Sequence, residues 1–218
     1  ERNTLTSEKV VSNPVAVTVT EEPLPWEGNG SEESPYLIKS VSDLEALREK
    51  VNKDGFTFSD AYFRLDADIT LPDGWKPIGA TKNGKVNLEN GANLNAFSGI
   101  LDGAGHTITV PEGGLPLFGY VINTRIRNRN IYLKKVAGYG LINNFEGVGL
   151  SGSAVEIDNV TLKSGSSTLK SGLIGANKTT NPYAGCSAAF VATIKNCTIE
   201  KGVVIGYDKK QSQIGAIA

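Results

Sequence analysis

The chain is poor in the residues that build most catalytic and metal-binding sites. Its 218 residues include one histidine, two cysteines and no methionine. Cys186 and Cys197 are 11 residues apart (197 − 186), a spacing that matches neither metal-ligand pairs nor a dense disulfide framework. No Gly-rich phosphate loop occurs either. The common zinc-dependent and nucleotide-binding classes are therefore excluded.

Net charge and long apolar runs are also lacking. Lys and Arg number 22 and Asp and Glu number 23, giving a net charge of −1, so no binding of nucleic acid or anionic membrane is expected. No apolar run approaches the roughly 18 residues of a membrane-spanning helix, so no membrane insertion is expected in this segment. Residues 1–12 lack the basic-then-apolar pattern of an export signal, which we expect to be absent or already removed.

Glycine, by contrast, is abundant. The 25 glycines lie between short apolar runs, which is typical of a chain with many turns and short strands. Residues 1–28 are predicted to form a strand at 15–20 and a Pro-containing linker, and residues 29–218 to form one domain. The sequence ends within a strand-like apolar run at 213–218. We therefore expect the domain to be truncated there and to belong to a larger exported protein.

One helix is predicted over residues 42–52. Ser42 followed three residues later by Glu45 is a capping-box pattern. Apolar residues recur at helical spacing on one face, which the Asp54-Gly55 pair ends. These residues are Leu44, Leu47 and Val51. So short a helix needs a surface to pack on, and we expect it to cap the N-terminal end of the remaining structure.

The rest of the chain reads as strands with internal repeats. Three segments contain an asparagine before an apolar-x-apolar strand, at Asn130, Asn159 and Asn196, with spacings of 29 (159 − 130) and 37 (196 − 159). Such repeats without intervening helices predict an all-β fold, a right-handed parallel β-helix with a short N-terminal capping helix. A second register, which pairs Asn128 with Asn159, stays open.

The asparagines have a physical role in this scheme. Ile157, Val160 and Leu162 can all face the core only if the backbone turns a corner at Asn159, because strand side chains otherwise alternate. Asparagine tolerates the left-handed backbone that such a corner needs. A second family of segments, with a small residue before an apolar pair, alternates with the first. These segments are 116–119, 140–143, 172–175 and 212–215.

Residues from about 28 onward resemble the bacterial repeat proteins that carry the GLUG motif, as in the N-terminal region of IgA-peptidase-type surface proteins. The matching motifs are Gly-Ser-x-x-x-Pro-Tyr-Leu-Ile at 30–38, Asp-Leu-x-x-Leu at 43–47, Tyr-Phe-x-Leu-x-x-Asp-Ile at 62–69, Trp-x-Pro-Ile-Gly at 75–79, Phe-Ser-Gly-x-Leu-Asp-Gly-x-Gly-His-Thr-Ile at 97–108 and Leu-Phe-Gly at 117–119. The resemblance implies a secreted or surface-attached bacterial β-helix protein without assigned catalysis.

His106 and the acidic residues are the obvious catalytic candidates. His106 could act as a general base with Asp102, four residues away, but the motif at 97–108 favours a structural role in a turn for both. A calcium site would need more ligands than the Asp66, Asp68 and Asp73 cluster offers. We therefore expect no catalytic, metal-binding or cofactor-binding residues.

Aromatic and cysteine residues give weaker signals. Trp26, Trp75, Tyr183 and Tyr207 could stack on sugars. Trp75 is expected to pack under the helix cap, and Tyr183 in a polar loop is the best ligand-contact candidate. Cys197 aligns with core positions, and a disulfide with Cys186 stays open.

The sequence thus predicts a non-catalytic module, adhesin-like or stalk-like, of a bacterial cell-surface or secreted protein. Loops at 81–95 and 177–185 would contact a host-surface protein or glycan. The oligomeric state stays open. The alternative is a carbohydrate-active enzyme, a polysaccharide lyase or glycoside hydrolase, or a glycan-binding β-helix. An enzyme should place acidic residues together in a groove with perturbed pKa values, whereas a stalk should show scattered charges.

Overall fold

A computed structural model describes residues 23–81, 94–134, 136, 141–145, 154–168 and 191–205. Within these ranges the fold is all-β, with parallel strands in one large sheet and a single helix, α1 (Val41–Asn52). The strands are β1 (Tyr36–Ile38), β2 (Tyr62–Leu65), β3 (Ile69–Thr70), β4 (Ala80–Thr81), β5 (Leu94–Asn95), β6 (Ile100–Asp102), β7 (Thr107–Val110), β8 (Phe118–Val121), β9 (Thr124–Leu133), β10 (Ile142–Phe145), β11 (Ala154–Leu162), β12 (Ser167–Thr168), β13 (Val191–Lys195), β14 (Thr198–Ile199) and β15 (Val204–Ile205).

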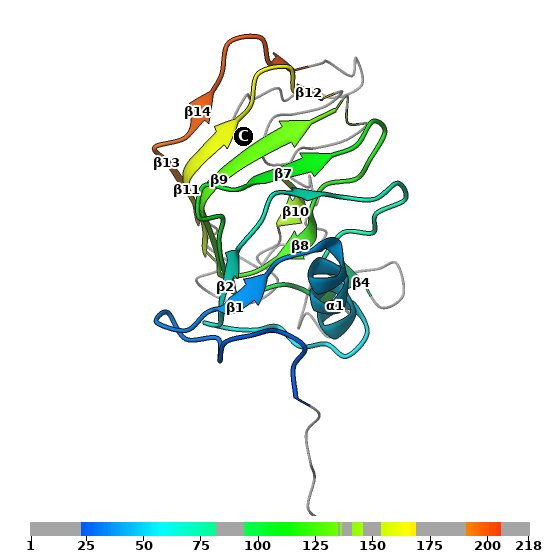
Figure 1. Ribbon diagram of the computed structural model, residues 1–218, viewed down its shortest axis with the longest axis vertical. Helices are drawn as coiled ribbons and strands as arrows, with labels where there is room; N and C mark the ends of the chain where they lie inside the picture. Colours follow the sequence, from blue (N-terminus) through cyan, green and yellow to red (C-terminus); the bar gives the residue numbers. More distant parts are fainter. Residues whose placement is uncertain are drawn as a thin grey trace, which may run out of the picture.

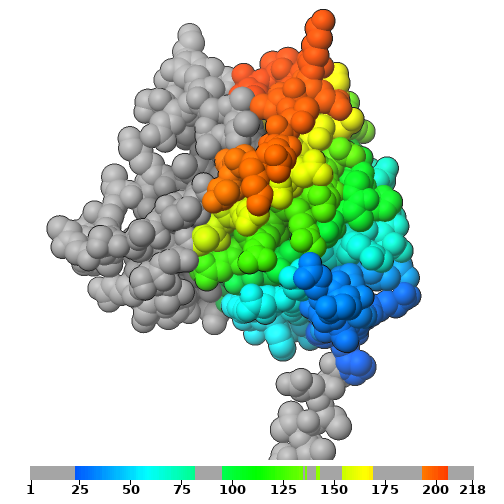
Figure 2. Space-filling view, turned by 90° about the vertical axis from the view of Figure 1, so that its left-hand side faces the viewer, coloured from blue at the N-terminus to red at the C-terminus, as the bar shows by residue number. Residues whose placement is uncertain are grey.

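The large sheet is built in chain order. Its main path is β1-β2-β6-β9-β11-β13, and every neighbouring pair on it is parallel. The segments lie as successive bands from the N-terminal to the C-terminal end (Figures 1 and 2). Because neighbouring strands are parallel, the chain must return after each strand to the end of the sheet where that strand began.

Inward side chains form continuous columns across the strands. One column consists of Tyr36, Phe63, Leu101, Ile126, Ile157 and Ile194. Its members are 27, 38, 25, 31 and 37 residues apart (63 − 36, 101 − 63, 126 − 101, 157 − 126, 194 − 157). A second column consists of Ile69, Ile108, Ile131, Leu162 and Ile199. The connections vary in length while the same apolar positions stay in register.

Smaller strand pairs lie beside the large sheet. β8 pairs with β10 in parallel, and Phe118 takes both Ile142 and Ile78 as partners. The predicted alignment of segment 116–119 with 140–143 is therefore confirmed, and segments 172–175 and 212–215 lie outside the described residues. β4 and β5 pair antiparallel, so the chain leaves the body at Thr81 and returns at Leu94.

The N-cap of the helix lies two residues before the predicted one. Ser40, not Ser42, is the N-cap: its Oγ accepts a hydrogen bond from the Asp43 N–H (3.3 Å), and Asp43 Oδ2 accepts from the Lys39 N–H (2.9 Å). The sequence offers both Ser40-x-x-Asp43 and Ser42-x-x-Glu45, and only the first is used. The predicted apolar face is correct, because Leu44, Leu47 and Val51 are fully buried.

The N-terminal end of the core is rich in aromatic rings. Trp26, expected in the linker, is buried and lies 5.4 Å from Phe63 and 5.5 Å from Tyr36 between ring centroids. Trp75 is also buried, with the Arg48 guanidinium of α1 5.1 Å from its ring centroid. α1 lies beside β1 and β2 at this end of the sheet (Figure 1). The strand predicted at 15–20 lies outside the described residues.

The corner predicted at Asn130 is wrong by two residues. Asn128, Asn159 and Asn196 have left-handed backbones, with φ of 53°, 51° and 55°. Asn130 is an ordinary strand residue that pairs with Thr107 and Thr161. The offset between β9 and β11 is 31 residues (157 − 126), as in the second register, because both strands turn at their left-handed asparagine.

Leu44→Asp should destabilise the fold by about 4 kcal/mol or more, since it removes buried apolar contacts and buries an unpaired carboxylate. Urea unfolding followed by circular dichroism measures the change. Ser42→Asp adds the same charge at an exposed position of the first helical turn, where negative charge is favourable. If both variants unfold at the same urea concentration, the helix does not contribute to the core.

Candidate functional site

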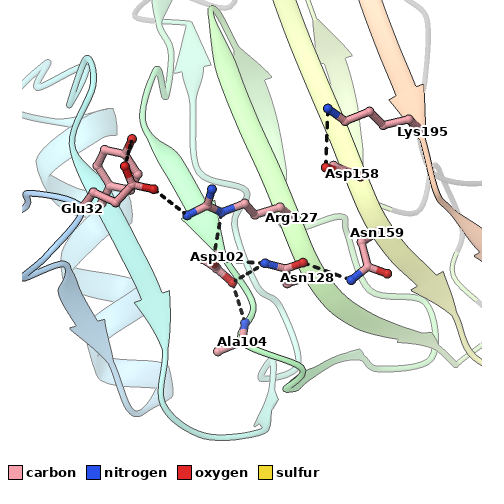
Figure 3. Close-up of polar contacts among 9 residues, drawn as sticks. Glu32, Asp102, Ala104, Arg127, Asn128, Asp158, Asn159 and Lys195 are labelled. Atoms are coloured by element: carbon pink, nitrogen blue, oxygen red, sulfur yellow. Dashed lines mark hydrogen bonds and ion pairs between the residues drawn. The ribbon is translucent and has the colours of Figure 1, made fainter.

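A ladder of polar side chains crosses the large sheet on its outer face (Figure 3). Arg127 of β9 lies at its centre. Arg127 Nε donates to Asp102 Oδ2 (2.9 Å) and Nη2 to Glu32 Oε1 (3.3 Å). Tyr62 joins the same group, because its hydroxyl donates to Glu32 Oε2 (3.2 Å) and its ring centroid lies 5.9 Å from the Arg127 guanidinium. One arginine thus binds two carboxylates, Asp102 and Glu32.

Asp102 connects this ion pair to the asparagine corners. Its Oδ1 accepts from the Ala104 N–H (2.8 Å), which holds the following turn, and its carboxylate also accepts from Asn128 Nδ2 (3.2 and 3.3 Å). Asn128 Oδ1 in turn accepts from Asn159 Nδ2 (3.0 Å). Asp102, Asn128 and Asn159 therefore form one hydrogen-bonded row across β6, β9 and β11.

The row does not continue to Asn196. Asn196 Nδ2 donates to Asp158 Oδ1 (2.8 Å) instead. Lys195 lies 2.7 Å from Glu156 Oε1 and 3.6 Å from Asp158 Oδ2, and the hydrogen bond to Glu156, with the charge of Asp158, raises the pKa of Lys195. The carboxylates of β11 are thus held by a lysine from β13, as Asp102 is held by an arginine from β9.

An open pocket of about 330 Å³ lies beside the asparagine row. Its lining residues are Ala104, Gly105, Asn128, Arg129, Asn130, Asn159 and Thr161. Some of the hydrogen-bonding groups of these asparagine side chains are already used, since Asn130 Nδ2 donates to the Gly105 carbonyl (2.7 Å). The Thr161 hydroxyl and the outward amide oxygens are groups that can hydrogen-bond a neutral polar ligand.

Among the described residues that line the pocket there is no carboxylate, so none of them forms an acid–base pair facing it. The three carboxylates nearest the row, on Asp102, Glu156 and Asp158, each lie against a basic side chain. General acid–base catalysis needs a carboxyl group free to exchange a proton with a ligand. This geometry suits binding through hydrogen bonds better than bond cleavage.

His106 and Asp102 do not meet as a catalytic pair. His106 Nδ1 lies 3.2 Å from Asp68 Oδ1, which also accepts from the Thr107 N–H (2.8 Å). The hydrogen bond from Thr107, followed by that from His106, holds the pKa of the Asp68 carboxyl below its ordinary value. His106 and Asp68 therefore join the loop after β2 to the start of β7.

The predicted acidic cluster does not form a metal site. Asp66 and Asp73 are exposed, and Asp68 is bound to His106 and Thr107. In the part of the chain that the structure describes, no three His, Cys, Asp or Glu side chains are placed to share a metal ion. Nor does any described helix have the length and apolarity to span a membrane.

The remaining candidates lie elsewhere. Trp26 and Trp75 are buried, so neither can stack on a sugar at the surface. Tyr183, Tyr207 and Cys186 lie outside the described residues. Cys197 is partly buried, and its Sγ lies 3.3 Å from the Lys195 carbonyl oxygen and 3.8 Å from that of Ile157.

Arg127 and Arg129 were not predicted as special positions. The feature that determines where both side chains point is the left-handed corner at Asn128, which reverses the alternation of inward and outward side chains along β9. With the corner at Asn128, Arg127 points outward into the ladder and Arg129 is buried. With the corner at Asn130, these assignments cannot be made.

Comparison with known proteins gives one partial match. No family model and no solved structure matches the chain. An alignment of 145 positions, which covers 62% of this chain, is 32% identical to halomucin from Haloquadratum walsbyi. The matched stretch spans about 2% of the length of halomucin.

Asp68 should make a small contribution to stability that acid removes. Its pKa in the folded state is lowered, so the contribution is fully present above the ordinary value of about 3.9 and is lost as the pH falls through the lowered pKa. Between about pH 5 and pH 2, the melting temperature of the unmodified chain should fall further than that of Asp68→Asn. Asp66→Asn removes another exposed carboxylate and should behave like the unmodified chain. Parallel curves for all three proteins would show that the His106 contact contributes nothing.

The two asparagines of β9 should differ in importance. Asn128→Ala loses the ladder bonds and places alanine in a left-handed backbone, so we expect a loss of about 1–3 kcal/mol in unfolding free energy. Asn130→Ala loses one exposed hydrogen bond and should cost less than about 1 kcal/mol. Urea unfolding of both variants measures the difference, and the opposite ranking would favour a corner at Asn130.

Proposed function

We propose that this chain is a right-handed parallel β-helix that serves as a non-catalytic module of a secreted or cell-surface protein. The chain visits two parallel sheets alternately, passing from β6 to β8, β9, β10 and β11. Successive strands of the large sheet recur after 25 to 38 residues (126 − 101, 101 − 63), a length that suits one coil with a loop. Parallel connections are almost always right-handed, which supports that hand here.

The observation that carries the proposal is the pairing of charges along the outer ladder. Glu32 and Asp102 both pair with Arg127, and the carboxylates of β11 are held by Lys195. Among the described residues of the ladder, the ionised groups bind one another, which leaves fewer of them able to act as an acid or a base. A supporting or presenting surface needs no free acid or base, whereas a glycoside hydrolase needs two carboxylates facing its substrate.

A cell-surface role has support from two directions. The partial similarity to halomucin is compatible with such a role. The resemblance to GLUG-motif surface proteins over residues 28–218 points the same way. Both similarities cover only part of the proteins compared, so the cell-surface location is part of what we propose.

The module would act by presenting loops to a partner. The segment between Thr81 and Leu94 leaves and returns at the antiparallel pair β4–β5, so its two ends are anchored side by side. We expect this loop and the one at 177–185 to contact a host protein or a glycan. Variation in a loop anchored this way leaves the columns of the sheet undisturbed.

Glycan binding at the sheet itself is a second candidate, because the open pocket beside the asparagine row is lined by amides, a hydroxyl, backbone and Arg129. Sugars present many hydroxyl groups that both donate and accept hydrogen bonds. Amide oxygens and the Thr161 hydroxyl could accept and donate in return. This candidate differs from the loop-contact proposal in the residues that it requires.

A glycan array combined with a cleavage assay tests these proposals. We expect the chain to release no reducing ends or unsaturated sugars from a polysaccharide panel. If the pocket binds glycans, Thr161→Arg should abolish array binding by filling it. Thr109→Arg makes the same change at another half-buried strand position outside the pocket and should leave binding intact.

Each outcome separates the candidates. Turnover of any polysaccharide, lost in Asp102→Asn, would contradict the non-catalytic module. Binding that is unaffected by Thr161→Arg would assign the contact to the loops. An array without any signal would contradict both glycan-binding versions and leave a protein as the partner of the loops.

A further inference from the structure

Arg129 points into the apolar interior, and the residues at the neighbouring inward positions are small or aliphatic. Its exposed fraction is 2%, and the flanking inward residues Ile126 and Ile131 are equally buried. Across the strand pair its partner is Val160 of β11. On the other side lies Gly103, where an added Cβ would be 2.3 Å from the Arg129 Cβ. Glycine at 103 therefore leaves the space that the Arg129 backbone and Cβ occupy.

The guanidinium of Arg129 has no partner among the described residues. Nε, Nη1 and Nη2 are all buried and make no hydrogen bond there. An arginine presents five N–H donors, so the entire hydrogen-bonding capacity of the group is unused. Asp102 is the acidic residue whose charge acts on it, but that carboxylate accepts from Ala104, Arg127 and Asn128 instead.

Burial alone does not neutralise this group. It lowers the pKa of Arg129 to about 9, against the opposing charge of Asp102, so the side chain is still a cation at neutral pH. An uncompensated charge in the interior is strongly destabilising. A compensating negative charge close to the guanidinium would remove most of that cost and satisfy its donors at the same time.

We propose that Arg129 binds a small inorganic monovalent anion, such as chloride, in the interior of the fold. The site must be small, because a side chain with 2% exposure cannot reach a polymer or a bulky organic acid at the surface. The neighbouring side chains Val160, Ile126 and Ile131 offer the anion no competing charge. Arg129 also belongs to the lining of the open pocket beside the asparagine row, so the tests differ in the residue changed: Thr161 for a glycan and Arg129 for the anion.

Urea unfolding of the whole chain at different chloride concentrations tests the site. Sodium gluconate replaces sodium chloride at constant ionic strength, because gluconate is too bulky to enter. For one bound anion, a tenfold rise in chloride above the dissociation constant should lower the unfolding equilibrium constant about tenfold. Arg129→Met keeps an unbranched apolar side chain without the charge and should lose this dependence. Arg125→Met removes an exposed arginine of the same strand and should retain it.

A crystal grown in bromide gives a second measurement that needs no variant. An anomalous peak within hydrogen-bonding distance of the Arg129 guanidinium would support the site even if Arg129→Met failed to fold. Equal chloride dependence in Arg129→Met and the unmodified chain would assign the effect to the surface and overturn the proposal. The absence of both a chloride effect and a bromide peak would overturn it as well.

Discussion

The left-handed backbone at Asn128 and Asn159 determines which side chains of β9 and β11 face the core. In a regular strand the inward residues are two apart, but Ile157 and Val160 are three apart and both are buried. The corner at Asn159 between them makes this possible. The same corner in β9 directs Ile126 and Arg129 inward together. Every later feature of the sheet depends on these corners being aligned.

Aligned corners also build the outer ladder. Because Asn128 and Asn159 occupy equivalent positions in paired strands, their amides meet at 3.0 Å and one donates to the other. Asp102 stands at the end of this row and accepts from Asn128, from the turn that follows β6 and from Arg127. The polar outer face and the apolar inner face therefore follow from the same register, and a slip of one residue would reverse both.

Part of this arrangement could be predicted from local patterns. The apolar face of α1, the alternation around Asn159 and the alignment of Phe118 with Ile142 are all present in short stretches of sequence. The predicted helix cap is wrong, because Ser40 and Ser42 are each followed three residues later by an acidic residue and the pattern does not distinguish them. Which serine caps the helix depends on where the preceding strand ends, and no local pattern contains that information.

The corner in β9 was placed wrongly for a different reason. Aligning Asn130 with Asn159 puts Ile131 opposite Val160, which matches apolar with apolar. The observed register puts Arg129 opposite Val160, a pairing that a preference for apolar cores rejects. Only the paired strands show that the corner is at Asn128. The one position where hydrophobic matching misleads is thus the position that holds a buried charge.

That buried charge makes the register between β6 and β9 more specific. The inward columns are otherwise largely apolar, so a slip of two residues, which keeps the same side chains inward, would bury similar groups. Gly103 and Arg129 differ, since a side chain at 103 would collide with the Arg129 Cβ at 2.3 Å. A shift of β9 against β6 would bring a larger residue to that place or turn the arginine to the outer face. An arginine beside a glycine therefore selects one alignment where apolar packing alone would select several.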